Sequence, residues 1–168
     1  MTVQQRSGKP VRLTLGIIII AGALAAGWIL WSSPAATGAD GNEAQKVAEG
    51  AIVYRDHCAS CHGANLEGQP NWKSRTAEGR LPAPPHDETG HTWHHADDAL
   101  FALIKHGLTP PLAPAGYQSD MPAFGAVLSD EQIWAVLVYI KSQWPEKIRT
   151  LQSSLNDADK KRRAERDR

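Results

Sequence analysis

The residues best suited to chemistry lie in one short stretch, which reads CASCH from Cys58 to His62. Two thiols three positions apart can add to the two vinyl groups of one haem, and a histidine that follows at once can coordinate the iron from below. The spacing matters because both thioether bonds and the iron ligand must reach one planar ring from a single turn of chain. The motif therefore predicts one covalently bound haem c, held by Cys58, Cys61 and His62.

Three other kinds of site contain two cysteines at this spacing. A thioredoxin-like redox pair expects a surrounding βαβ pattern, which the sequence does not show. A zinc site could use Cys58, Cys61 and two histidines, but the chain has only two cysteines, too few for a four-cysteine site. A structural disulfide across two residues is strained and uncommon. Haem c is the favoured interpretation, and these three are its alternatives.

A second candidate iron ligand is Met121, the only methionine besides the initiator. It begins the stretch MPAFG within a proline-rich segment and lies on no apolar helical stripe. The usual role of a lone methionine, which is to fill gaps in a core, is therefore less convincing here. A thioether is a soft ligand that favours Fe(II) and raises the reduction potential, as an electron carrier requires. We expect Met121 to be the second axial ligand.

Four histidines lie within the ten residues HDETGHTWHH, at His86, His91, His94 and His95. Because imidazole suits copper and zinc, one hypothesis is a metal site. The plainer interpretation is a polar loop followed by the start of a helix. A histidine of this cluster in place of Met121 on the iron is a further alternative.

The elements that must position these residues are predicted to be helices, because apolar residues recur at helical spacing and no strand pattern is present. One helix has an especially clear start, where Ser129 and Gln132 form a capping-box pattern. Helices are expected at about residues 43–59, 96–106 and 129–144, with a weaker one beyond Pro145 before a mobile end. Residues 63–92 and 109–125 are expected to be loops.

Residues 13–31 contain no charge, and as a helix they would span roughly 28 Å, enough to cross a bilayer. Residues 1–12 carry only basic charge, which predicts that the N-terminus stays in the cytoplasm and that the remainder is exported. A cleaved signal peptide is the alternative, although its apolar region is usually shorter. The cut would then fall near Ala35, Ala36 or Ala39.

The charges are segregated along the chain. Residues 13–140 hold 6 basic and 13 acidic side chains, a net charge of −7, which argues against a nucleic-acid-binding core. We therefore expect five parts: a basic cytoplasmic N-terminus (1–12), a transmembrane anchor or uncleaved signal (13–31), a linker (32–43), a globular domain (44–144) and a helical, basic tail (145–168).

The order of a helix, the CASCH motif, proline-rich loops, MPAFG and a capped last helix resembles the small monohaem cytochromes c of mitochondrial and bacterial type, over about residues 44–144. The resemblance implies an all-α cytochrome c fold, with three to four helices around a covalent haem and His62 and Met121 as iron ligands. Here one N-terminal transmembrane helix is expected to precede the domain. The long segment 64–95 and the tail make the chain more similar to the membrane-anchored bacterial members.

Two further expectations come from this resemblance. The first and last helices should cross at a close contact, where Gly50 and Tyr139 occupy the matching places, since only glycine permits such an approach. A backbone carbonyl of a downstream proline should also accept a hydrogen bond from His62. Pro82, Pro84 and Pro85 are the candidates, and Pro84 is favoured.

The resulting hypothesis is an electron-transfer protein, not an enzyme, tethered to the cell inner membrane by a single span with its cytochrome domain in the periplasm. As the resemblance implies, a quinol-oxidising cytochrome complex would donate the electron and a terminal oxidase would accept it. One alternative is a haem-bearing subunit of a membrane oxidoreductase complex. A haem-based sensor or small peroxidase, and a copper-handling protein, are weaker alternatives.

Overall fold

The computed structural model describes residues 39–168. The predicted membrane span at residues 13–31, and most of the predicted linker, lie outside this range. Within it, no helix is both long and apolar enough to cross a bilayer. The described part contains helices and loops but no strand, which confirms the all-α prediction for these residues.

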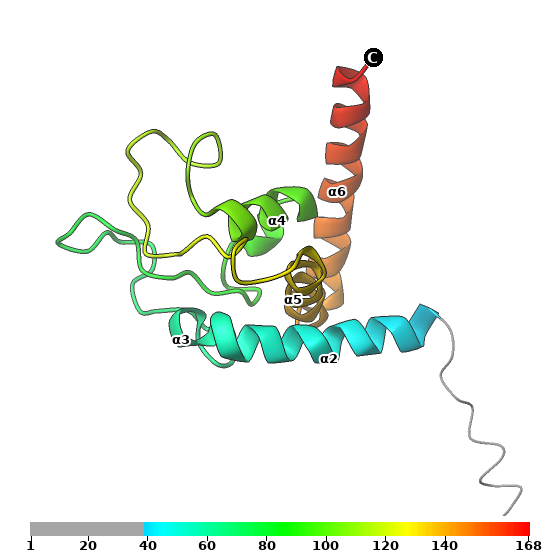
Figure 1. Ribbon diagram of the computed structural model, residues 1–168, viewed down its shortest axis with the longest axis horizontal. Coiled ribbons are helices and arrows are strands. Elements are labelled where there is room, and N and C mark those ends of the chain that lie inside the picture. The colour runs from blue at the N-terminus through cyan, green and yellow to red at the C-terminus, as the bar shows by residue number, and fades with distance from the viewer. Residues whose placement is uncertain (1–38) are drawn as a thin grey trace, which may run out of the picture. The chain divides into compact units, whose positions relative to one another are not determined.

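Five α-helices and one short 3-10 turn form the domain (Figure 1). They are α2 (Ala39–His57), α3 (Ala59–His62), η1 (Thr92–His94), α4 (Asp97–His106), α5 (Asp130–Ser142) and α6 (Glu146–Arg166). The predicted loops at residues 63–92 and 109–125 contain no α-helix. The boundaries of α4 and α5 agree with the sequence to within about two residues.

Two helix boundaries differ from the prediction. Helix α2 begins at Ala39, so the last residues of the predicted linker are helical. Helix α6 continues to Arg166, whereas a mobile end was expected. The reason is local, because Arg162 and Arg163 both form ion pairs with Asp159 one turn earlier. Alanine, lysine and arginine also have high helix propensity.

Helices α2 and α5 cross at a point where their backbones touch (Figure 1). A Cβ atom added to Gly50 would collide with the carbonyl oxygen of Ala135 and would lie 2.8 Å from Cβ of Tyr139. The expected contact between Gly50 and Tyr139 is therefore confirmed. Helix α5 is held at its start by the predicted capping box, in which Ser129 and Gln132 bond each other's backbone N–H groups.

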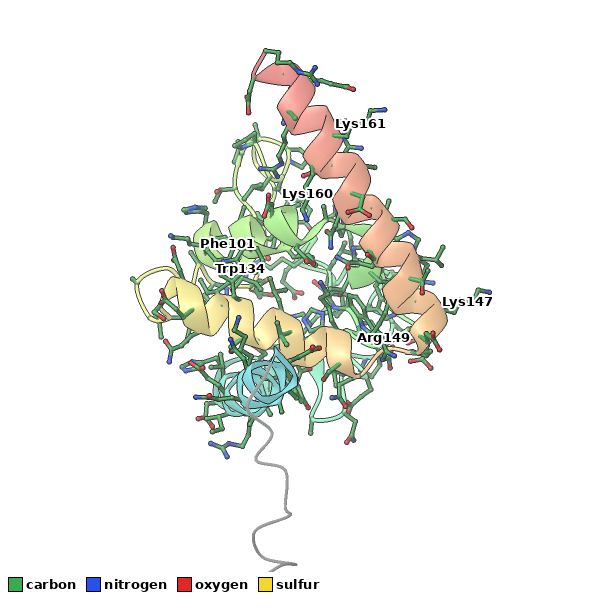
Figure 2. All side chains as sticks on the ribbon, turned by 90° about the vertical axis from the view of Figure 1, so that its right-hand side faces the viewer. Phe101, Trp134, Lys147, Arg149, Lys160 and Lys161 are labelled. Carbon is green, nitrogen blue, oxygen red and sulfur yellow. The ribbon has the colours of Figure 1, made fainter. Side chains whose placement is uncertain are left out.

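The hydrophobic core gathers around this crossing. Apolar faces of α2 and α5 meet there, and the loops on either side add one leucine each. Its buried members are Val53, Tyr54, Leu66, Leu128, Ile133, Val136, Ile140 and Trp144. Helix α4 covers α5 from another side, where Phe101 stacks on Trp134 with ring centroids 4.7 Å apart (Figure 2).

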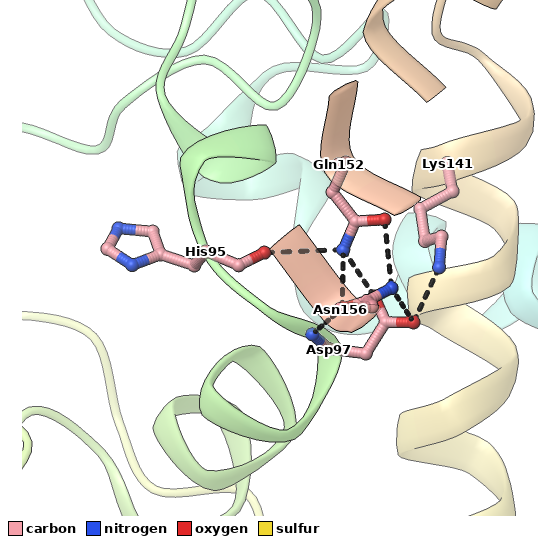
Figure 3. Close-up of polar contacts among 5 residues, drawn as sticks. All are labelled: His95, Asp97, Lys141, Gln152 and Asn156. Atoms are coloured by element: carbon pink, nitrogen blue, oxygen red, sulfur yellow. Dashed lines mark hydrogen bonds and ion pairs between the residues drawn. The ribbon is translucent and has the colours of Figure 1, made fainter. Parts of the chain in front are cut away.

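The carboxylate of Asp97, at the start of α4, is the centre of a polar cluster that holds α6 to the domain (Figure 3). One oxygen of this carboxylate accepts from Lys141 Nζ at 2.6 Å and from Asn156 Nδ2 at 2.9 Å, and the other accepts from Gln152 Nε2 at 2.6 Å. Gln152 is only 1% exposed. Asp97 therefore joins α4, α5 and α6 in one polar cluster, whereas Lys147 and Lys161 point away from the domain (Figure 2).

We expect Asp97→Ala to reduce the free energy of unfolding by about 2–3 kcal/mol, because it leaves the buried amide of Gln152 and the ammonium of Lys141 without their shared partner. Chemical denaturation followed by circular dichroism measures this loss. The matched control is Asp98→Ala, which removes only an exposed ion pair to Arg163 and should cost less than about 1 kcal/mol. Equal effects of the two substitutions would contradict the role of the Asp97 cluster.

Candidate functional site

The two thiols and the histidine of the predicted motif lie on the single turn α3, which follows α2 almost without a break. Cys58 caps this turn, and its backbone N–H donates to the carbonyl of Tyr54 at the end of α2, at 2.9 Å. The N–H of His62 in turn donates to the carbonyl of Cys58 at 2.9 Å. Both thiols are free, with Cys58 half-buried and Cys61 exposed. The helix hydrogen bonds thus present both thiols and the imidazole from one turn.

The imidazole of His62 is held by a backbone carbonyl, as the family resemblance implied. Its Nδ1 lies 2.8 Å from the carbonyl oxygen of Pro84, the favoured proline of the three candidates. Because a carbonyl oxygen can only accept, the proton sits on Nδ1 and Nε2 keeps its lone pair. Burial lowers the pKa of His62. The hydrogen bond to Pro84 acts in the opposite direction and raises it, but by less. A neutral imidazole with a fixed tautomer is the form that coordinates a metal.

The end of the motif is fixed by Tyr54, a residue that the sequence did not single out for the site. Its hydroxyl donates to the carbonyl oxygen of Gly63 at 2.9 Å, and a longer contact of 3.3 Å reaches the carbonyl of His62. Burial is the main cause that raises the pKa of Tyr54, so the hydroxyl stays protonated and remains a donor. This bond ties the last turn of the motif back to α2.

Burial also raises the pKa of the Cys58 thiol, to about 11. The neighbouring Cys61 adds to this shift. The surroundings of Cys58 therefore favour a neutral sulfur over a thiolate. A thioether is neutral, so the site is compatible with a thioether bond at this position.

Met121 lies half-buried in the loop between α4 and α5. Two backbone hydrogen bonds fasten this loop to the end of α4, from Phe124 N–H to Ile104 O and from Gly125 N–H to Lys105 O, both at 2.9 Å. Figure 1 shows this loop on the same side of the domain as the loop that follows α3. These two hydrogen bonds hold the loop to α4 only a few residues after Met121.

Arg80 is a second residue that the sequence did not indicate. Its Nε is buried and has no hydrogen-bond partner among residues 39–168. Its terminal nitrogen pairs with Asp120, the neighbour of Met121. The Arg80 side chain as a whole is 43% exposed, but an enclosed guanidinium N–H without a partner suits an anionic group such as the propionate carboxylate of a haem. Two free thiols, a neutral imidazole and this N–H together fit a haem c.

The four clustered histidines each pack against another ring, and His91 and His95 pack edge-on against each other with centroids 5.5 Å apart. His86 stacks on His62, His91 stacks on Trp72, and His94 stacks on Trp93. In the part of the chain that the structure describes, no group of three or more histidine, cysteine or acidic side chains could hold a metal ion. The hypothesis of a copper or zinc site in this cluster therefore gains no support from the geometry.

Comparison with known proteins agrees with this arrangement. Residues 45–140 match the family model described as cytochrome c oxidase, cbb3-type, subunit III. The chain is 29% identical over 94 residues to a cbb3-type cytochrome c oxidase subunit FixPc of Rhizobium leguminosarum bv. viciae. It is 30% identical over 95 residues to a cbb3-type cytochrome c oxidase subunit FixP of Azorhizobium caulinodans.

These similarities cover 56% of this chain in both cases, but only 29% and 28% of the two relatives. The chain thus aligns with less than a third of the length of the curated relatives that it matches. No solved structure matches significantly.

Proposed function

Because the chain belongs to the family of subunit III of cbb3-type cytochrome c oxidase, we propose that it carries one electron at a time on one covalently bound haem c. The observation that carries this proposal is the hydrogen bond between His62 and Pro84, which leaves Nε2 free beside two unpaired thiols. The chain contains a single CxxCH motif and no other cysteine, which supports one haem.

The chain supplies the covalent bonds, the iron ligands and the charge compensation for this group. We propose that Cys58 and Cys61 would hold the haem covalently, that His62 and Met121 would ligate its iron, and that Arg80 would pair with a propionate. When bound, the haem would supply a one-electron Fe(II)/Fe(III) couple. With two iron ligands supplied by the chain, no substrate would need to reach the iron.

The proposed acceptor is a terminal oxidase, and the proposed donor is a quinol-oxidising cytochrome complex. The family match favours a second candidate function, in which the chain is a haem-bearing subunit of the oxidase complex itself. The two differ in an observable way. A subunit should co-purify with oxidase subunits after mild solubilisation, whereas a separate carrier should not.

The proposed location is the inner membrane, with residues 1–12 in the cytoplasm and the cytochrome domain in the periplasm. The uncharged stretch at residues 13–31 and the basic charge before it support this orientation. A tether of this kind would raise the effective concentration of the domain near membrane-bound partners.

The proposed function is tested by expressing the full chain in a host that attaches haem c and recording absorption spectra with and without carbon monoxide. We expect one covalent haem per chain and a low-spin spectrum in both oxidation states. The absorption spectrum of the reduced protein should not change when carbon monoxide is added. Ready binding of carbon monoxide would show an open or labile sixth position. The sensor or peroxidase interpretation would then replace the electron carrier.

A further inference from the structure

His86 lies face to face with the proposed iron ligand. The ring centroids of His86 and His62 are 3.9 Å apart and their planes differ by 20°. The two residues are 24 positions apart in the chain, so loop 63–91, not a shared helix, brings them together. Because Pro84 already bonds Nδ1 of His62, the stacked ring is a second, independent constraint on the same imidazole.

His86 itself is held at three atoms. Its Nδ1 lies 2.8 Å from the hydroxyl oxygen of the buried Thr92. Its backbone N–H donates to the carbonyl of Leu66 at 2.8 Å, and its own carbonyl accepts from Trp144 Nε1 at 2.7 Å. Trp144, just beyond the end of α5, is 1% exposed. The position of the ring is therefore fixed by the core and not by local sequence.

A third ring encloses the pair. Tyr54 packs edge-on against the His86 ring, with ring centroids 6.2 Å apart.

The hydrogen bond to Pro84 and the stack restrict the His62 ring in different ways. The hydrogen bond holds Nδ1 near the Pro84 carbonyl, but a single hydrogen bond tolerates some rocking of the ring about the Cβ–Cγ bond. A flat ring packed against the face of the imidazole limits this rocking. We propose that His86 is a positioning residue that sets the plane of the His62 ring and thereby the orientation of the axial ligand. This inference rests on the proposed function, in which His62 binds the haem iron.

The plane of an axial imidazole has a spectroscopic signature that a purely structural role would not change. In a ferric haem the plane decides how unpaired spin spreads over the porphyrin, and the four haem methyl groups report it as separate proton NMR shifts. The protein can therefore tune the haem through the orientation of a ligand as well as through its identity.

The test compares two substitutions at one position in the full-length protein with its haem attached. His86→Phe keeps a flat ring against His62 but loses the hydrogen bond to Thr92. His86→Gln keeps a polar group for Thr92 but loses the flat ring. We expect the pattern of haem methyl shifts to stay close to wild type in His86→Phe. In His86→Gln we expect it to change in order or spread.

Covalent haem content and the midpoint of denaturation are measured for both variants, so that a folding defect is recognised. Thr92→Val serves as a further control, because it removes the polar partner of His86 without removing the His86 ring, and its shift pattern should stay as close to wild type as that of His86→Phe. A wild-type shift pattern in His86→Gln, or equal changes in His86→Phe and His86→Gln, would overturn the proposal. Carbon monoxide binding reports on Met121 separately, so failure of the proposed function is distinguishable from failure of this inference.

Discussion

Replacing Met121 with alanine is expected to convert a low-spin haem that does not bind carbon monoxide into a high-spin haem that binds it. The reason is that alanine offers no sulfur, so the sixth position is left to water or to an added ligand. The reduction potential should fall by on the order of 0.1 V or more, because a thioether favours Fe(II) and axial ligands set haem potentials over about 0.8 V. Absorption spectra with carbon monoxide and a redox titration measure both effects.

Two control variants separate ligation from the fold of the loop. Ser119→Ala removes the hydroxyl that accepts a hydrogen bond from the backbone N–H of Met121, at 3.0 Å, and should leave the haem low-spin. Met121→His should restore a six-coordinate haem with a potential below that of the wild type, since imidazole is a harder ligand than a thioether.

An unchanged, low-spin Met121→Ala protein would refute methionine ligation. The alternative raised by the sequence, a histidine of the cluster at His86, His91, His94 and His95, would then be the first to test. The structure makes this alternative less attractive for three of the four side chains, because His86, His91 and His94 are each stacked on another ring.

The sequence predicts the parts of this site that depend on local spacing. Cys58, Cys61 and His62 lie within one helical turn. The hydrogen bonds of any helix would therefore bring them together. The capping box at Ser129 is equally local. Gly50 and Pro84 were expected through the family resemblance, and the structure confirms both contacts.

The sequence does not predict contacts between residues that are far apart in the chain. The bond from Trp144 to His86 spans 58 positions, and the pair of Arg80 with Asp120 spans 40. Neither contact leaves a periodic pattern in the sequence. An arginine or a histidine in a loop gives the same sequence signal whether its side chain is exposed or buried. Only the folded loops show that Trp144 bonds the residue stacked on His62, and that Arg80 pairs with the sequence neighbour of Met121.

Replacing Gly50 with alanine is expected to destabilise the domain by about 2–3 kcal/mol, although alanine is the better helix former by about 1 kcal/mol. The added Cβ would collide with the backbone carbonyl of Ala135 and crowd Cβ of Tyr139. A backbone atom inside α5 cannot move aside as the end of a flexible side chain can. The crossing of α2 and α5 must therefore widen, which loosens the core on both sides.

Chemical denaturation measures this effect, and a second variant on the same helix isolates it. Ala48→Gly changes an exposed residue of α2, and it should cost only about 1 kcal/mol through helix propensity. If Gly50→Ala were instead more stable than wild type, as it would be on an exposed helix, the close crossing would be contradicted.

The crossing also connects the two halves of the proposed haem site. Helix α2 leads directly into the turn that carries Cys58, and α5 ends next to Trp144, whose indole bonds the carbonyl of His86. A wider crossing shifts the motif relative to the loop that holds His62 in place. We therefore expect Gly50→Ala to lower the yield of covalently attached haem together with stability, whereas Ala48→Gly should leave the haem yield unchanged.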